Sequence, residues 1–175
     1  MELRASERFA ADAGDVAAIL ADPAFHRAAM ARVGGGAVTG DVTVTGSTPG
    51  AFLVSIRWTM AADSLPEQVR AYVPGGLSVR HVNAWGTGAP DGTRHGTVTM
   101  DIVGAPIHLH GTVTLTPRGP GVCELVYVTS LRATIPFASG TIEQATAPAV
   151  RQALRAERDE LVARLTPDSA TSPAP

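Results

Sequence analysis

Two histidines close together, His108 and His110 in the stretch "GAPIHLHGT", are the first candidates for chemistry in this sequence. Residues two apart on a β-strand point to the same face, so both imidazoles could act on one ligand. With Asp101 placed opposite His110 on a neighbouring strand, they could form a two-histidine, one-carboxylate metal site. The alternative is that the pair faces solvent. Which of the two holds depends on whether the strand alternation puts the histidines on the inner or the outer face of the predicted sheet.

A second set of polar side chains lies in "VRHVNAW", where strand alternation puts His81, Asn83 and Trp85 on one face with Leu77 and Val79. Burying a polar group without a partner costs roughly 1–3 kcal/mol. Polar groups that alternation carries inward therefore predict either a ligand or hydrogen bonds to neighbouring backbone or water, and both readings stay open for His81 and Asn83.

Proton transfer needs an imidazole, phenol or carboxyl group held next to the substrate. The inward-facing groups of that kind are His81, Tyr127 and Glu7, which are the candidates for catalytic residues. For Glu7 we favour a different role, in which it lies at the rim of the sheet and pairs with an arginine.

Composition indicates one folded domain with no attraction to polyanions. The 175 residues are 45% hydrophobic and 17% charged, with a formal net charge of -2, which argues against nucleic-acid and anionic-lipid partners. No uncharged apolar run approaches the ~20 residues of a membrane helix, so we expect a cytoplasmic protein without membrane insertion. No phosphate-binding, nucleophile or metal motif is present in the sequence, so we expect no cofactor and no metal. The single Cys123 is expected to be a buried strand residue.

Period-two alternation of apolar residues, broken by turn residues, predicts seven strands. They cover residues 3–9, 38–45, 51–60, 77–85, 96–103, 108–116 and 122–133. We expect a single domain over residues 1–165 and a disordered tail over residues 166–175.

Helical spacing and cap residues predict four helices. Asp12 caps a short helix, Pro23 begins a second that ends at the glycines 34–36, and a third short helix spans 65–73. A long C-terminal helix covers about 138–165, with Ala145 and Ala149 in its apolar stripe. His26 in the second helix and His95 in a loop are both expected at the surface.

This order of elements resembles the START-like superfamily, also called SRPBCC, helix-grip or birch-pollen-allergen-like. "ADPAFHRAAMARVGG", "SLPEQVRAYV", "GTVTMDIVGAPIHLHGTVTLTP" and "TIPFASGTIEQ" are similar to an actinobacterial family of unknown function within it. The resemblance covers about residues 1–160. It implies an α+β fold in which a curved, seven-stranded antiparallel sheet wraps around a long C-terminal helix. Two short helices follow strand 1, another lies between strands 3 and 4, and a cavity separates sheet and helix.

The apolar face of each strand is taken as the inner face, which shows whether each remaining side chain points into the protein or towards solvent. Val98 and Val113 face inward together, which puts His108 and His110 on the outer face, towards solvent. The inner groups expected to contact a ligand are Trp58, Val79, His81, Asn83, Trp85, Met100, Tyr127, Thr129 and Ile142. For any aliphatic member of this set, packing in the core is the competing role.

Three functions fit these observations. The first is non-catalytic binding of a small hydrophobic or amphipathic ligand, lipid-like or polyketide-like, in the cavity. The second is a cyclase, dehydratase or hydrolase that uses the inner histidine, and the third is an interaction module whose pocket its own side chains fill. The edge strand at 38–45 could pair with a second copy, but Asp41 in its middle disfavours that, so we expect a monomer or a weak homodimer.

Overall fold

Seven antiparallel strands form one sheet in the structure, a computed structural model that describes residues 1–34, 38–64, 75–134, 136–137 and 139–166. The order across the sheet is β1-β7-β6-β5-β4-β3-β2. The strands are β1 (Glu2–Phe9), β2 (Val38–Gly46), β3 (Phe52–Met60), β4 (Leu77–Trp85), β5 (Arg94–Ile102), β6 (Ile107–Gly119) and β7 (Val122–Ala133). All seven predicted strands are confirmed, with ends that differ by at most three residues.

The helices are α1 (Ala13–Leu20), α2 (Pro23–Gly34), the 3-10 turn η1 (Ala62–Ser64) and α4 (Ser139–Leu165). The fold-class prediction is confirmed, because the curved antiparallel sheet packs against a long C-terminal helix. The short helix predicted at 65–73 lies outside the described residues, and so does the predicted tail from residue 167 onwards. Of the helices in the described ranges, none has both the length and the apolarity needed to cross a bilayer.

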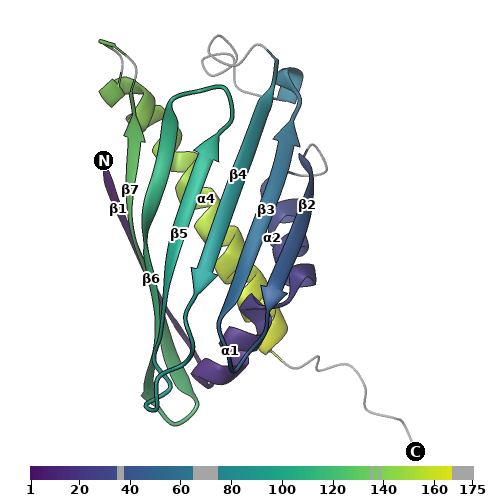
Figure 1. The fold of residues 1–175 in the computed structure, drawn as a ribbon, viewed down its shortest axis with the longest axis vertical. Coiled ribbons are helices and arrows are strands. Elements are labelled where there is room, and N and C mark those ends of the chain that lie inside the picture. The colour runs from purple at the N-terminus through teal and green to yellow at the C-terminus, as the bar shows by residue number, and fades with distance from the viewer. Residues whose placement is uncertain (35–37, 65–74, 135, 138, 167–175) are drawn as a thin grey trace, which may run out of the picture.

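All described helices that cover the sheet lie on one of its faces. Figure 1 shows α4 running diagonally across that face, with α1 and α2 beside it. α2 packs against α4 and β2, while α4 also contacts β7 and β1. The inward side chains of the strands therefore meet the helices in one core, in which Val54, Val113 and Leu161 are fully buried.

Two details of the helices differ from the sequence prediction. Asp12 stands at the N-cap position of α1 with extended backbone, but its side chain accepts no hydrogen bond from the helix. It accepts one from the backbone N–H of Gly121 instead, at 3.0 Å, and so ties the helix start to the β6–β7 turn. On α4, Ala145 and Ala149 are exposed, because the buried face of the helix follows Ala147 and Val150 instead.

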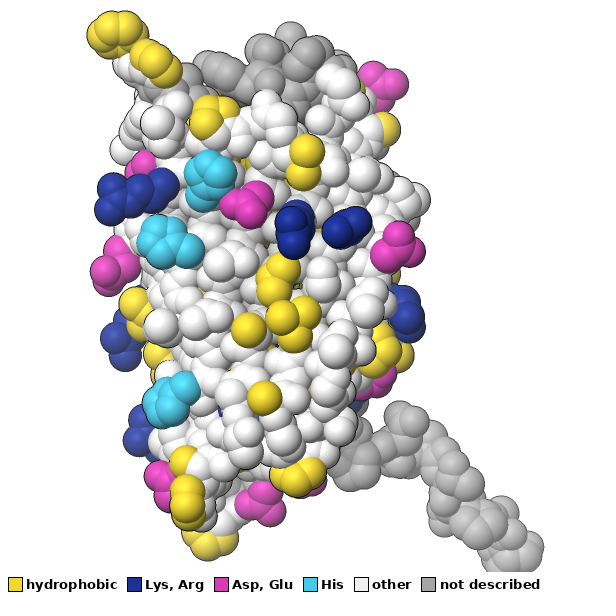
Figure 2. All heavy atoms as spheres, in the orientation of Figure 1, with side chains coloured by type: hydrophobic (Ala, Val, Ile, Leu, Met, Phe, Trp, Pro, Cys, Tyr) yellow, Lys and Arg dark blue, Asp and Glu magenta, His cyan; other side chains and the backbone are white. Residues whose placement is uncertain are grey.

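The outer face of the sheet is polar, and the histidine pair lies on it. His108 and His110 are exposed, as predicted from the alternation, and Figure 2 shows histidine side chains on this face among other polar groups. The register corrects the expected partner: Asp101 lies opposite His108, not His110, and its Oδ1 is 2.7 Å from Nδ1 of His108. Among the described residues no group of three metal-binding side chains comes together, here or elsewhere.

Candidate functional site

A cavity of about 120 Å³ lies between the inner face of the sheet and the helices α2 and α4. Most of its wall is apolar: Ala29, Met30, Val33, Val38, Ile56, Trp58, Val98, Met100, Leu109, Val150, Ala153 and Leu154. Its polar lining consists of His26, His81, Tyr127, Thr129 and Glu157. A mainly apolar wall with a few converging polar groups is the usual character of a small-molecule site.

Each helix contributes to this wall through one stripe of side chains. The lining residues of α2 are His26, Ala29, Met30 and Val33, which follow the spacing i, i+3, i+4, i+7. Those of α4 are Val150, Ala153, Leu154 and Glu157, with the same spacing. Residues at this spacing share one helix face, so each helix presents three apolar side chains and one titratable group to the cavity.

The two cavity histidines are held as neutral imidazoles. The Nε2 of His26 lies 2.8 Å from the carbonyl oxygen of Leu20, which can only accept, so Nε2 carries the proton. Burial lowers the pKa of His26 to about 4. His81 Nε2 lies 2.9 Å from Oδ1 of Asn83, and burial lowers the pKa of His81 as well. In both rings this leaves Nδ1 as the unprotonated nitrogen.

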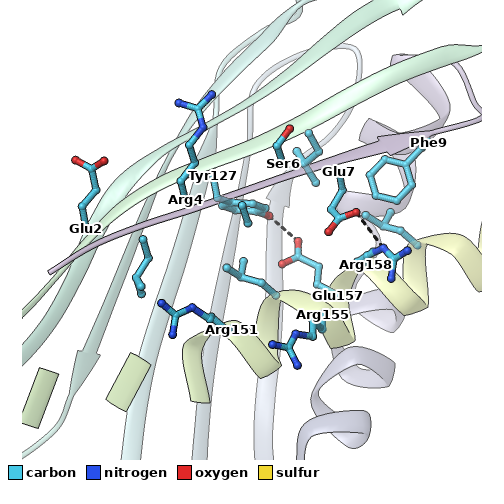
Figure 3. A pocket seen from close by; sticks show the side chains of 15 residues that line it. Glu2, Arg4, Ser6, Glu7, Phe9, Tyr127, Arg151, Arg155, Glu157 and Arg158 are labelled. Atoms are coloured by element: carbon cyan, nitrogen blue, oxygen red, sulfur yellow. Dashed lines mark hydrogen bonds and ion pairs between the residues drawn. The ribbon is translucent and has the colours of Figure 1, made fainter. Parts of the chain in front are cut away.

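A hydrogen-bonded acid pair, Tyr127 and Glu157, spans from β7 to α4. The Tyr127 hydroxyl donates to Oε1 of Glu157 at 2.7 Å (Figure 3). Burial raises the pKa of Glu157 to about 7, and the bond from Tyr127 only partly offsets this. Burial and the neighbouring Glu157 raise the pKa of Tyr127 well above its ordinary value. The cavity wall therefore holds a carboxyl group that titrates near neutral pH.

The predicted ligand contacts divide into two groups. Trp58, His81, Met100, Tyr127 and Thr129 line the cavity. Val79, Asn83, Trp85 and Ile142 are buried but do not line it. Trp85 stacks on Phe52 with ring centroids 6.0 Å apart, and Asn83 accepts the hydrogen bond from His81. Trp85 and Asn83 therefore support residues around the cavity and do not line it themselves.

Glu7, the third candidate for proton transfer, lies away from the cavity. Its Oε2 is 3.0 Å from Nε of Arg158 on α4, which agrees with the predicted pairing with an arginine (Figure 3). The half-exposed pair lies in a groove between β1 and α4. The structure thus brings His81 and Tyr127 to one cavity and leaves Glu7 outside it.

The sequence analysis missed two polar groups of the cavity, His26 and Glu157. His26 is buried, and the expectation that it lies at the surface is wrong. His95 is exposed as expected but belongs to β5 and not to a loop. The helical spacing of His26 with Met30 and of Glu157 with Leu154 is the signal that could have placed both missed groups on inward faces.

A chain of ion pairs fixes α2 beside α4 at one end of the cavity. Glu160 of α4 accepts from Arg32 of α2 and from Arg164, each at 2.9 Å. Arg164 also contacts Asp22, just before α2, at 2.6 Å. Glu160 is only 8% exposed, so the carboxylate is desolvated and depends on both arginines. This network keeps the lining stripes of the two helices facing the same space.

Comparison with known proteins supports the architecture. A family model described as "Protein of unknown function (DUF2505)" matches residues 4–165 of the chain. A search of curated proteins finds no match.

Solved structures with the same fold include enzymes and a START protein. The Zhui aromatase/cyclase from Streptomyces sp. R1128 aligns with a TM-score of 0.55 at 13% identity, over 98% of this chain and 99% of its own. Norcoclaurine synthase from Thalictrum flavum aligns at 0.52 and 13% identity, over 94% and 86% of the two chains. A START superfamily protein from Mycobacterium smegmatis aligns at 0.52 and 13%, over 94% and 99%. At such identities the likeness shows the fold alone.

Proposed function

Because this chain belongs to the DUF2505 family and has the START fold, we propose that it binds a small apolar or amphipathic molecule between its sheet and α4. The observation that carries the proposal is the cavity itself, whose wall of twelve apolar side chains is interrupted by five polar ones. Such a wall favours the transfer of an apolar group out of water, and the polar groups orient it.

The electrostatics of the cavity restrict what it accepts. His26 and His81 are neutral at pH 7, because burial lowers the pKa of both. The hydroxyls of Tyr127 and Thr129 are neutral too, and each donates to an oxygen of the protein. Glu157, the remaining polar group, has its pKa raised by burial to about 7, so it is partly ionised at pH 7 and would repel an anion. The part of the ligand that enters this space should therefore carry no negative charge and one or two hydrogen-bonding atoms at most.

The cavity's volume sets a bound on the enclosed part of the ligand. Ligand pockets usually span about 300–1,000 Å³, and the cavity here holds about 120 Å³. The large side chains of Trp58, Met100 and Tyr127 occupy part of the space, as the alternative of a pocket filled by the protein's own side chains requires. The remaining volume suits a short alkyl chain or a single ring.

Filling the cavity from α4 tests the proposal. Ala153→Phe puts a ring into the space that Ala153 lines. We expect the affinity for the neutral apolar dye N-phenyl-1-naphthylamine, of which the phenyl ring alone matches the enclosed volume, to fall at least ~10-fold, about 1.4 kcal/mol. The matched control is Ala149→Phe, the same change on the exposed face of the same helix, which should bind the dye as the wild type does. Equal dye affinity in the two variants would place the binding site elsewhere.

An acid–base enzyme is the second candidate, and one observation favours it. Glu157 lines the cavity with a pKa of about 7, where a carboxyl group can both donate and accept a proton at neutral pH. His81 lines the same cavity and could serve as its partner in proton transfer. This role requires that Glu157 does titrate near neutrality, which its effect on stability can report.

The unfolding free energy should carry the signature of Glu157. Between pH 4.5 and 7 the unfolded carboxyl is ionised while the folded one keeps its proton, so this group makes stability fall as pH rises and has no further effect above about 7. His26 acts in the opposite direction between pH 4 and 6.5. The measurement is therefore the difference between wild type and Glu157→Gln in urea unfolding across pH 4–9. A difference that does not change with pH would remove Glu157 as an acid–base group.

A further inference from the structure

A second, larger pocket lies next to the cavity, in the groove between the edge strand β1 and α4. Its volume is about 390 Å³, within the usual range for ligands. The floor is apolar, formed by Leu3, Ala5, Phe9, Leu125, Leu154 and Leu161. Arginines of α4 line one side, and Figure 3 shows them along that helix, below β1.

Only a thin partition separates the groove from the cavity. Tyr127, Leu154 and Glu157 line both spaces, so the hydrogen-bonded pair and one leucine form the shared wall. The pair joins β7 to α4 through a single hydrogen bond. A connection between the small apolar compartment and the larger one that is open to solvent therefore has to pass between these three side chains.

The charges of the groove favour an anion. Glu7 is paired with Arg158 at 3.0 Å, and Figure 3 shows that Glu2 and Arg4 point away from α4. Arg151 and Arg155 remain, one helical turn apart, and no side chain of the described residues forms an ion pair with either. Two like charges at i, i+4 repel each other, so an anion bound between them would remove an unfavourable interaction.

We propose that the ligand is an amphipathic organic anion whose acid group binds Arg151 and Arg155 in the groove while its apolar part passes Tyr127 into the cavity. This inference rests on the proposed function, because the apolar part occupies the same cavity. It also explains why that cavity is small, since the enclosed space needs to hold only one end of the molecule. A carboxylate and a phosphate ester share this chemistry.

Glu157 sets the conditions for binding. Below pH 7 its carboxyl is mostly protonated, since burial raises its pKa to about 7, and it does not repel an acid group in the groove. The other titratable groups around the partition are Tyr127, His26 and His81, whose shifted pKa values favour the neutral forms, and the paired Glu7 and Arg158. Arg151 and Arg155 therefore make the net charge facing the groove positive.

The test compares ligands that differ only in the acid group. Decanoate, decyl phosphate and decan-1-ol are each used to displace N-phenyl-1-naphthylamine from the full chain at pH 6.5. We expect each anion to bind at least ~10-fold more tightly than the alcohol, which is the scale of one charge-assisted hydrogen bond. In the double variant Arg151→Ala/Arg155→Ala this preference should vanish while the affinity for decan-1-ol stays unchanged. Whether decanoate or decyl phosphate binds more tightly distinguishes the two sources of the acid group.

A matched control removes two arginines elsewhere. Arg57→Ala/Arg80→Ala takes the same charge from the exposed outer face of the sheet and should keep the preference for anions. An equal preference in the groove variant and the wild type, or none in the wild type, overturns the inference. If the dye still binds and Ala153→Phe still prevents it, the proposed function survives that result, whereas dye binding insensitive to Ala153→Phe rejects both.

Discussion

Replacing Arg94 with leucine is expected to lower the free energy of unfolding by about 3–5 kcal/mol. The side chain is only 5% exposed, and its guanidinium donates to three backbone carbonyls. Nη1 donates to Gly50 at 2.8 Å and to Gly86 at 2.5 Å, and Nη2 donates to Pro49 at 2.9 Å. Leucine leaves these carbonyl oxygens without a donor and uncouples the β2–β3 turn from the end of β4.

Urea unfolding followed by the fluorescence of the two tryptophans measures this loss. The control is Arg57→Leu, an exposed arginine on the outer face, for which we expect a change within about 0.5 kcal/mol. Arg94→Lys should recover only part of the stability, because an ammonium group cannot reach three carbonyls in a planar fork. A loss below 1 kcal/mol for Arg94→Leu would mean that water replaces the guanidinium.

Gly111→Ala is the second change expected to have a large effect, about 3 kcal/mol or more of destabilisation. Gly111 lies in β6, between β5 and β7, opposite Val98 and Thr129. A Cβ at this position would stand 2.1 Å from the carbonyl oxygen of Val128 and 2.6 Å from Cα of Thr129. These are backbone atoms of a central strand, so the clash can be relieved only by moving β7 away from β6.

The same substitution at Gly14 should have the opposite sign. Gly14 is in α1, and a Cβ there meets no heavy atom within 4 Å. Alanine restricts the unfolded chain and favours helix, so stability should rise by about 0.5–1 kcal/mol.

Because Thr129 lines the cavity, Gly111→Ala should also weaken dye binding. Thermal and urea unfolding of the Gly14→Ala and Gly111→Ala variants measure both changes in the free energy of unfolding. A loss below 1 kcal/mol for Gly111→Ala would show that β7 moves away from β6 at little cost.

The sheet was predictable because its residues alternate strictly. In β3 the apolar residues Phe52, Val54 and Ile56 face inward, and the register found in the structure keeps every such face on the helix side. A slip by one residue would expose the whole set, so alternation determines both strands and faces. The outward placement of His108 and His110 followed from the same rule.

The polar interior was less predictable, for two physical reasons. Arg94 begins β5 on the inward face, in register with the alternation of that strand. The carbonyls of Pro49 and Gly50 to which it donates are more than forty residues away in the chain, and no local pattern predicts them. Glu157 lies within the charged run "RAERDE", where composition suggests a solvated helix face. Its spacing with Ala153 and Leu154 does indicate the inward face, but the apolar stripe predicted for this helix also took in the exposed Ala145 and Ala149, so the stripe did not define one face.

The order of strands constrains how the chain folds. β1 is the first strand in the sequence, yet among the strands that the structure describes its one partner is β7, so contacts such as the one from Thr129 to Leu3 join residues 126 positions apart. The strands from β2 to β7 can pair with their sequence neighbours as hairpins, whereas β1 must wait until β7 is complete. During synthesis on a ribosome, the groove between β1 and α4 therefore cannot form until β7 and then α4 have emerged. Until then β1 lacks its strand partner, and the backbone N–H and C=O groups that β7 later pairs are exposed to chaperones.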